Sequence, residues 1–395
     1  MKPLLDGVRI LDMSQMLAGP YCSMLMADLG AEVIKIESPG EGDRIRQMGI
    51  YRIGGQSAYF LSINRNKKSV TLNLKSEKGR EIFYELVKKS DVVFDNLRPA
   101  TLQKLGASYE HVKGHNPKII SCSITAFGPD GPYADHPAFD LTLQAISGAM
   151  SYTGEPGRPP VRMGLPMGDL AGALMAAFSI SSALYKREKT GEGCKLDISL
   201  LDSVVSLHTY VVQYLVAGSP IPEQIGSGHI SVVPYGAFKT ADGWITIAIF
   251  TERFWENFCN ILGVPELAKD PRFTTNNDRS KNRGVLIPMI EEKLIAKTTD
   301  EWVEILSKER IPCGALNTMD KVLQDEQLRH RDMIVAVEIP EGGKTEMLGN
   351  PVKAKDMDQM YRFSPELGEH TEQILTEILG LEELEINELR DNGII

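Results

Sequence analysis

Short apolar runs and longer stretches with helical periodicity alternate along the first 200 residues of the chain. Each apolar run has five to seven residues, which is a typical length for a buried strand. The runs that predict strands are residues 8–13, 31–37, 69–74, 91–95, 119–124 and 196–200. The stretches that predict helices or turns are residues 21–29, 77–89 and 102–111. Strands that alternate with helices form parallel sheets with right-handed crossovers, so we predict an α/β fold with a Rossmann-like large domain.

A different pattern begins after a predicted long helix at residues 201–217 and a linker-like stretch at residues 218–222. Residues 235–248 have the alternation of a β-hairpin, with the turn at Asp242-Gly243. Helical stretches follow at residues 252–262, 283–296 and 299–309. Together these features indicate a smaller α+β domain.

The last part of the chain resembles the first part more than the middle. Residues 334–338 and the Gly342-Gly343 turn predict strands that return to a sheet, and Glu-rich helices end the chain. We therefore expect residues 1–217 to form the first part of the large domain and residues 226–328 to form the small domain. Residues 329–395 are expected to return to the large domain.

A proline-broken loop at residues 160–169 ends in a lone acid, Asp169, and is followed by an uncharged apolar stretch from residue 170 to residue 185. Residues 132–148 repeat this design around Asp140. An acid at the start of a helix often caps the free backbone N–H groups there. In an apolar cleft it can instead be a nucleophile that the helix N-terminus keeps ionised. The pattern alone leaves both roles open.

Composition excludes several classes of protein. A hydrophobic content of 42% and a charged content of 24% are typical of globular enzymes, and a net charge of −10 disfavours nucleic-acid binding. The five cysteines have no disulfide or zinc spacing, and we expect no metal site. The longest uncharged run is shorter than the roughly 20 residues that span a bilayer. The expected location is cytoplasmic, without membrane association.

Common catalytic motifs are absent from the sequence. It contains no P-loop, no GxSxG and no HExxH motif, and the missing GxGxxG disfavours an NAD-type dehydrogenase. Lys75 and Arg98 each follow a predicted strand. Loops at the carboxyl ends of parallel strands commonly bind ligands, and cations there suit a multiply phosphorylated ligand.

A series of sequence blocks, in order along the whole chain, resembles the class III CoA-transferases, which include formyl-CoA and crotonobetainyl-CoA transferases. The blocks are residues 17–20 (LAGP), 28–37 (DLGAEVIKIE), 64–75 (NRNKKSVTLNLK), 127–133 (FGPDGPY), 144–148 (QAISG), 168–169 (GD), 189–193 (KTGEG), 311–313 (IPC) and 367–371 (LGEHT).

The resemblance implies an interlocked homodimer whose large domain binds CoA. It also implies transfer of CoA from an acyl-CoA donor to a carboxylic acid acceptor. Asp169 would attack the thioester to give a mixed anhydride, and some family variants pass through an aspartyl-CoA thioester. The CoA thioester would be a substrate, and no permanently bound cofactor is expected.

The family's binding residues carry over to matching positions. The residues expected to contact CoA are Leu17, Ala18, Leu72, Lys75, Asn96, Leu97, Arg98 and Lys104. The predicted substrate pocket contains Met16, Phe139, Asp140 and Met167. One hypothesis is that Arg162 binds the second carboxylate of a dicarboxylic acceptor.

Two positions depart from the family pattern. Ser38 stands where one family member has an arginine, so Arg44 or Arg46 would have to replace that phosphate contact. The glycine-rich loop of formyl-CoA transferase has no clear counterpart, and residues 226–229 (GSGH) are the nearest candidate.

Two other functions remain as alternatives. The α-methylacyl-CoA racemases of the same superfamily use a His-Asp pair, which aligns here with Phe139-Asp140. Because phenylalanine cannot transfer a proton, the required base is missing. A non-catalytic acyl-CoA-binding protein is the other alternative, and the presence of Asp169 disfavours it.

Overall fold

The computed structural model describes residues 2–340, 342–355, 357 and 359–395. Residue 1 of the predicted first segment, and residues 341, 356 and 358 of the predicted last segment, lie outside this description. The chain forms two compact units. The first unit comprises Met1–Ser147, Gly164–His208 and Glu326–Ile395, and the second comprises Gly148–Met163 and Thr209–Asp325.

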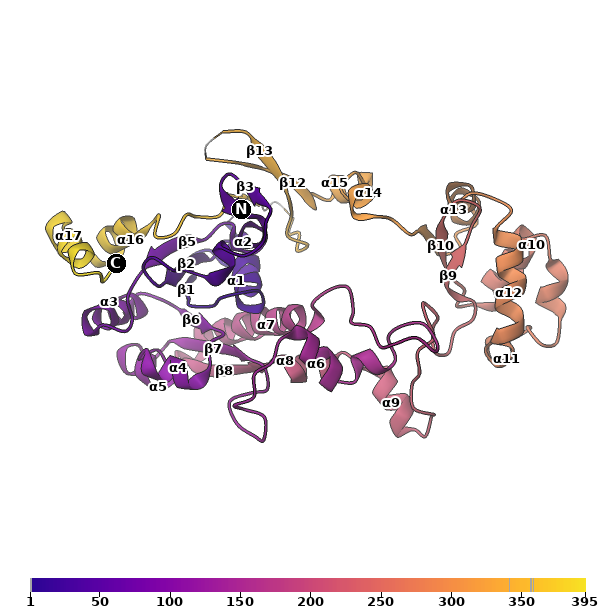
Figure 1. Ribbon diagram of the computed structural model, residues 1–395, viewed down its shortest axis with the longest axis horizontal. Coiled ribbons are helices and arrows are strands. Elements are labelled where there is room, and N and C mark those ends of the chain that lie inside the picture. The colour runs from indigo at the N-terminus through magenta and orange to yellow at the C-terminus, as the bar shows by residue number, and fades with distance from the viewer. Residues whose placement is uncertain (1, 341, 356, 358) are drawn as a thin grey trace. The chain divides into compact units, whose positions relative to one another are not determined.

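The first unit is built on a six-stranded parallel sheet, drawn in Figure 1. In sheet order the strands are β5 (Lys68–Thr71), β2 (Glu32–Glu37), β1 (Arg9–Asp12), β6 (Val92–Asp95), β7 (Ile120–Thr125) and β8 (Cys194–Ser199). The chain moves outward from β1 to β5 and then returns to place β6 on the other side of β1. The strand order therefore reverses between β1 and β6, where sheets of this kind commonly bind ligands. The prediction of an α/β fold with a parallel sheet is confirmed.

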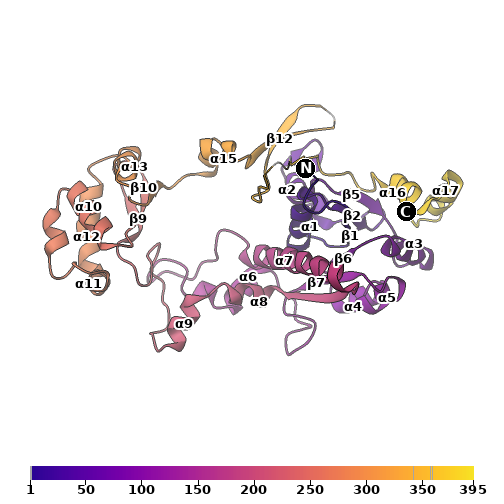
Figure 2. The same ribbon diagram turned by 180° about the vertical axis from the view of Figure 1, so that it is seen from behind.

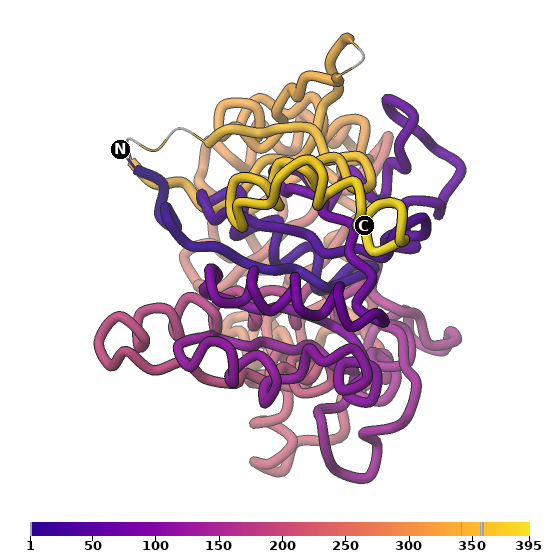
Figure 3. Tube along the Cα trace, turned by 90° about the vertical axis from the view of Figure 1, so that its left-hand side faces the viewer, coloured from indigo at the N-terminus to yellow at the C-terminus, as the bar shows by residue number. Residues whose placement is uncertain are grey.

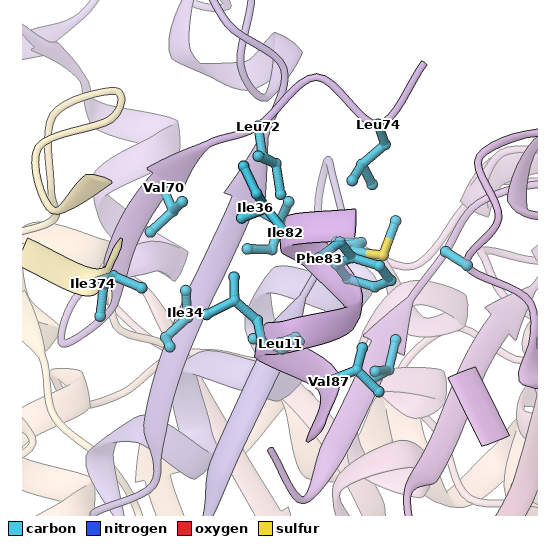
Figure 4. Packing of buried hydrophobic residues seen from close by; sticks show 14 of the residues in the cluster. Leu11, Ile34, Ile36, Val70, Leu72, Leu74, Ile82, Phe83, Val87 and Ile374 are labelled. Atoms are coloured by element: carbon cyan, nitrogen blue, oxygen red, sulfur yellow. The ribbon is translucent and has the colours of Figure 1, made fainter. Parts of the chain in front are cut away.

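Alternating strand residues pack into two different cores, one on each face of the sheet. Leu11 and Val93 belong to the core beneath α3 (Glu77–Lys88) and α16 (Thr371–Leu379), and Figure 4 shows this core. The neighbouring residues Ile10 and Val92 belong to the opposite core. Side chains alternate between the faces of a strand, so a sheet covered on both sides has continuous apolar strands.

The opposite core lies beneath α1 (Ala18–Asp28) and α7 (Met167–Thr190), which pack side by side (Figures 1 and 2). By length and composition α7 could cross a membrane, a criterion that the core helix of a folded domain also meets. Here its buried Ala173, Ala176 and Ile180 contribute to the core beneath it. Helix α7 is longer than the uncharged stretch at residues 170–185, because it also includes Asp169 and the charged residues after Tyr185.

The C-terminal segment returns to the first unit by a different route from the one expected. Strands β12 (Ile334–Glu338) and β13 (Lys344–Leu348) pair only with each other among the described residues, so the expectation that they join a larger sheet is wrong. The free edge of β5 instead meets the start of α16, where Ser69 accepts the N–H of His370 at 2.9 Å. Backbone groups at the free edge of β5 thus already have hydrogen-bond partners in the C-terminal segment. Figure 3 shows the C-terminal helices beside the N-terminal strands.

One predicted helix, and one stretch predicted as a helix or turn, are each divided in two. Residues 201–217 form α8 (Leu200–Ser206) and α9 (Tyr210–Val216), and the chain turns between them at Thr209, whose φ is 42°. The second stretch of the first unit ends at His208, and Thr209 begins a stretch of the second unit, so one crossing between the units lies at this turn. Residues 102–111 likewise fall across α4 (Pro99–Lys104) and α5 (Tyr109–His115).

The second unit contains a three-stranded antiparallel sheet covered by helices. Its strands are β9 (Tyr235–Lys239), β10 (Trp244–Ala248) and β11 (Cys313–Ala315), and its main helices are α10 (Glu252–Ile261), α12 (Arg283–Leu294) and α13 (Thr299–Lys308). Shorter helices are α11 (Asn276–Lys281) and α14 (Met319–Val322). The hairpin turns at residues 240–243, where the N–H of Thr240 donates to the carbonyl of Gly243 at 3.0 Å.

The first unit also contains several short elements. They are the 3₁₀ helix η1 (Arg44–Arg46), the strands β3 (Arg52–Ile53) and β4 (Gln56–Ser57), and the helices α2 (Ala58–Asn64), α6 (Asp140–Ile146), α15 (Glu326–His330) and α17 (Glu383–Asp391).

Candidate active site

The first turn of α7 lies beside the start of α6. The Asp140 carboxylate accepts the backbone N–H of Gly168 at 2.7 Å through Oδ1, and the side-chain amide of Gln144 at 2.6 Å through Oδ2. Asp140 therefore caps α7 from a neighbouring helix, because it accepts an N–H group that has no partner within α7. Phe139 occupies the N-cap position of α6, so Asp140 does not have the capping role in its own helix that the sequence pattern left open.

Asp169 lies in the same turn but does not cap it. The N-cap position of α7 is Pro166, and Asp169 already lies inside the helix. Among the residues that the structure describes, none donates a hydrogen bond to the half-buried Asp169 carboxylate. The N-cap interpretation of Asp169 is therefore wrong, and its carboxylate oxygens stay available for chemistry.

The surroundings of Asp169 make its carboxylate unusually basic. Burial raises the pKa of Asp169 to about 6, and the nearby charge of Asp140 adds to this effect. Both causes disfavour the ionised form. At neutral pH most of the carboxylate is still ionised, because pH 7 lies above this pKa. A partly desolvated and basic carboxylate in a first helical turn is a candidate nucleophile.

Tyr59 on α2 is a site residue that the sequence analysis missed. Burial raises the pKa of its phenol, and the charges of Asp169 and Asp43 raise it further, so the phenol lies within the field of both carboxylates. Tyr59 packs against the same buried cluster as Met16 and Leu17. No pattern in the sequence connects α2 with α7, because more than 100 residues separate Tyr59 from Asp169.

The loops after β1 and β6 bring together five of the residues predicted to contact CoA. Leu17 and Ala18 follow β1, whereas Asn96, Leu97 and Arg98 follow β6, which is its neighbour in the sheet. The Asn96 side chain joins the two loops, since its Nδ2 donates to the carbonyl of Gln15 at 2.7 Å and its Oδ1 accepts the N–H of Gln15 at 2.8 Å. These residues thus lie where the strand order reverses.

The other three predicted CoA-contacting residues lie on other segments of the first unit. Leu72 and Lys75 follow β5, and the exposed Lys104 ends α4. The side chain of Lys75 is exposed, whereas Leu72 is buried in the core beneath α3. If Leu72 contacts a ligand, the contact therefore comes from its backbone. The contacts of all these residues with CoA stay predictions.

Comparison with known proteins gives the family. The model of CoA-transferase family III matches residues 5–371. This chain belongs to CoA-transferase family III. The prediction from the sequence blocks is therefore confirmed. In the part of the chain that the structure describes, no group of three or more His, Cys, Asp or Glu side chains could hold a metal ion.

Individual relatives of this family III CoA-transferase agree with the family match. It is 38% identical to the human succinyl-CoA:glutarate CoA-transferase, over 100% of this chain and 90% of that protein. It is 37% identical to the acetyl-CoA:oxalate CoA-transferase of Acetobacter aceti, over 89% and 90% of the two chains. The crystal structure of a CAIB/BAIF family protein from Brucella suis has a TM-score of 0.85 and 36% identity, over 96% of this chain and 100% of that one.

Arg44 and Arg46, the two arginines that could replace the family arginine at position 38, have different surroundings in the transferase. The guanidinium of Arg46 donates to both carboxylate oxygens of Glu37, at 2.8 and 2.7 Å, and lies over the ring of Phe60. Its charge is therefore already paired within the first unit. Arg44 is exposed on η1, and Ser38 is exposed just after β2. Of the two candidates for a phosphate contact, Arg44 is the more available.

The remaining predicted residues are divided between the two units of the transferase. Phe139 is 78% exposed beside Asp140, and Met167 begins α7. Arg162 and the GSGH stretch at residues 226–229 belong to the second unit. The guanidinium of Arg162 donates to the carbonyl of Met163 at 3.1 Å.

Proposed function

We propose that this enzyme transfers CoA from an acyl-CoA donor to a carboxylate acceptor, with Asp169 as the covalent nucleophile. The observation that carries this proposal is the Asp169 carboxylate itself. It is half-buried, accepts no hydrogen bond from the described residues, and has a pKa raised to about 6. A carboxylate is a weak nucleophile in water, and loss of solvation makes it more reactive.

The first half of the reaction releases the donor acid. An Asp169 oxygen attacks the thioester carbonyl, the C–S bond breaks, and a mixed anhydride and the CoA thiolate form. The thiolate then attacks the aspartyl carbonyl carbon of the anhydride. The C–O bond breaks, the donor acid leaves as a carboxylate, and Asp169 becomes an aspartyl-CoA thioester.

The second half repeats these steps with the acceptor. The acceptor carboxylate attacks the aspartyl-CoA carbonyl, which gives a new mixed anhydride and again the CoA thiolate. The thiolate attacks the acceptor's own carbonyl carbon, so the new acyl-CoA forms and the Asp169 carboxylate is restored. No proton, oxidant or reductant is consumed.

The first turn of α7 supports this chemistry. The N–H of Gly168 is bound to Asp140, and the N–H of Leu170 donates to the carbonyl of Pro166 at 3.0 Å. Within the described residues, the N–H of Asp169 has no such acceptor. A free N–H next to the reacting carboxyl group can stabilise the oxyanion that forms at each attack.

Dicarboxylic acids are the acceptors that we propose to test first. The human and Acetobacter aceti relatives are named for glutarate and oxalate, which are both dicarboxylates. Their acyl-CoA donors differ between the two names, so the donor is best found by a panel of acyl-CoAs.

The covalent step can be tested by mass spectrometry. The enzyme is mixed with each acyl-CoA, treated with hydroxylamine and digested. We expect a hydroxamate on Asp169 with the correct donor and none in an Asp169→Ala variant. Solvent deuterium that enters the α-carbon of the acyl group, without any adduct, would instead favour the racemase alternative.

Asp140 is expected to set the acidic limb of the pH profile. The Asp140→Asn variant removes the charge that helps to raise the pKa of Asp169. The pKa of Asp169 should then fall, so the ionised nucleophile should persist to lower pH. We expect the acidic limb of kcat/KM to move below its wild-type position near pH 6, and steady-state rates from pH 4 to pH 8 would measure the shift.

The cap and the charge of Asp140 can be separated. Asparagine keeps an oxygen that can accept the N–H of Gly168, whereas alanine does not. Asp140→Ala should therefore also cost about 0.5–2 kcal/mol of stability, a loss that Asp140→Asn should largely avoid. An acidic limb that stays at the same pH in both variants would contradict the electrostatic role of Asp140.

We propose in addition that the enzyme works as an interlocked homodimer. Large apolar side chains on α6 and α7 are exposed within the first unit, which is typical of an interaction surface. They are Leu141, Ile146, Leu174, Phe178 and Tyr185. Phe178→Glu should weaken association in light scattering, whereas Leu348→Glu, at an exposed apolar position on β13, should not.

A further inference from the structure

The loop between β1 and α1 has an unusual set of hydrogen bonds. The Ser14 N–H donates to Asp12 Oδ1 at 2.9 Å, and the Ser14 carbonyl accepts from Lys35 Nζ at 2.7 Å. Both backbone groups of Gln15 are bound to the Asn96 amide, as described above. The Met16 N–H donates to Asp43 Oδ1 at 3.2 Å. Five backbone groups in three consecutive residues are thus bound by side chains, not by other backbone.

These bonds hold the loop in a conformation that the chain would otherwise avoid. Met16 has a φ of 68°, in the left-handed region that a residue with a side chain rarely adopts. Such a conformation persists only where the surrounding structure determines it. The loop also lies against α1, since a Cβ added to Gly19 would come within 2.2 Å of the Ser14 Cβ.

The side chains that hold the loop belong to a buried ion network. Lys35 Nζ lies 3.0 Å from Asp43 Oδ2, and their side chains are 1% and 0% exposed. Lys67 pairs with Asp12 at 3.1 Å, and Glu37 accepts the N–H of Asp43 at 2.9 Å. Buried ion pairs usually stabilise a fold no better than well-packed apolar side chains. The side chains of this network also orient the loop backbone through hydrogen bonds, which apolar side chains could not do.

The loop packs against the same buried cluster as Tyr59. Met16 and Leu17 pack with Tyr59 against a cluster that includes Phe60. Burial raises the pKa of the Tyr59 phenol, and the charges of Asp169 and Asp43 raise it further. A shift of the loop would therefore move Met16 and Leu17, which pack against the same cluster as Tyr59.

We propose that Lys35 and Asp43 are positioning residues for the transfer reaction, because their side chains fix the loop of Ser14, Gln15 and Met16. This loop contains Met16 of the predicted substrate pocket and leads into the predicted CoA-contacting residues Leu17 and Ala18. This role rests on the proposed function of Asp169. The pair touches no substrate itself, so its contribution acts through the loop.

The test uses a double variant that keeps the buried site neutral. Lys35→Met/Asp43→Asn removes both charges and the bond to the Ser14 carbonyl, while the asparagine oxygen can still accept the N–H of Met16. We expect kcat to fall about 10- to 100-fold, since small misplacements near a reacting group have effects of this size. The affinity for free CoA, measured by calorimetry, should fall by a smaller factor than kcat. The predicted phosphate-binding cations Lys75, Arg98 and Lys104 lie outside this loop, while Leu17, Ala18 and Asn96 adjoin it.

A matched control comes from a second buried pair. Arg65→Met/Asp28→Asn removes an equally buried ion pair of the same unit, with side chains 2% and 0% exposed, and these residues do not bond to the loop. This control should keep its kcat within about threefold of the wild type. Equal losses of kcat in both double variants, or an unchanged kcat in Lys35→Met/Asp43→Asn, would overturn the proposal.

A third variant tests the loop without any change in charge. Gly19→Ala should displace Ser14 by contact alone and should reproduce the loss of kcat, even if the double variant fails to fold. Wild-type kcat in Gly19→Ala would overturn the positioning role. Failure of the proposed function gives a different result: full transfer activity in Asp169→Asn would show that another group is the nucleophile.

Discussion

Asp169→Asn is expected to lower the rate of CoA transfer by about 10⁴-fold or more, because a covalent nucleophile has no substitute within the reaction. The amide has nearly the same shape as the carboxylate, and no hydrogen bond from the described residues depends on its charge. The fold and the affinity for CoA should therefore change little. The measurement is the rate of acyl-CoA formation from a dicarboxylate acceptor, together with calorimetric binding of free CoA.

Asp197→Asn is a suitable control for this experiment. Asp197 on β8 also has a raised pKa, caused first by burial, although the lysine at position 195 lowers it. It takes no part in the contacts around α6 and α7. Its replacement should leave the transfer rate within about twofold, since a perturbed pKa alone does not identify a catalytic group. If Asp169→Asn kept more than about one hundredth of the activity, the covalent mechanism would fail.

The parallel sheet could be predicted because each of its strands is encoded locally. Buried parallel strands are continuous apolar runs, and their helices have their own periodicity, so neither depends on distant partners. The predictions failed where distant partners decide the outcome. The hairpin of β12 and β13 has strand-like residues, but the edge of β5 is already occupied by His370 and Thr371.

In the candidate site, too, the locally encoded features could be predicted and those that depend on distant contacts could not. Asp169 and Asp140 could be found because each follows a proline-broken loop and precedes an apolar helix. That Asp140 caps the helix of Asp169 could not be found, because the contact joins residues 28 positions apart. The role of the buried Lys35 is even harder to predict from the sequence. In the sequence it is a lysine within a strand, and only the fold brings Asp43 and Ser14 to it.

Arg65→Met is expected to destabilise the first unit by about 3–5 kcal/mol, which is the usual cost of leaving a buried charge without its partner. The Arg65 guanidinium donates to both oxygens of Asp28, at 3.0 and 2.7 Å. Asp28 also accepts from the Asn350 amide at 3.2 Å, so this carboxylate ties the returning C-terminal segment to α1. Removal of Arg65 therefore weakens a junction between distant parts of the chain as well as an ion pair.

The two units offer separate signals for this experiment. All three tryptophans, Trp244, Trp255 and Trp302, lie in the second unit, so their fluorescence reports on that unit. Far-UV circular dichroism reports on both units. In Arg65→Met we expect the dichroism transition in urea to begin at a lower concentration while the fluorescence midpoint stays near that of the wild type. An equal shift of both signals would contradict a local effect. Adding Asp28→Asn should recover at least half of the loss, because the double variant no longer buries an unpaired charge.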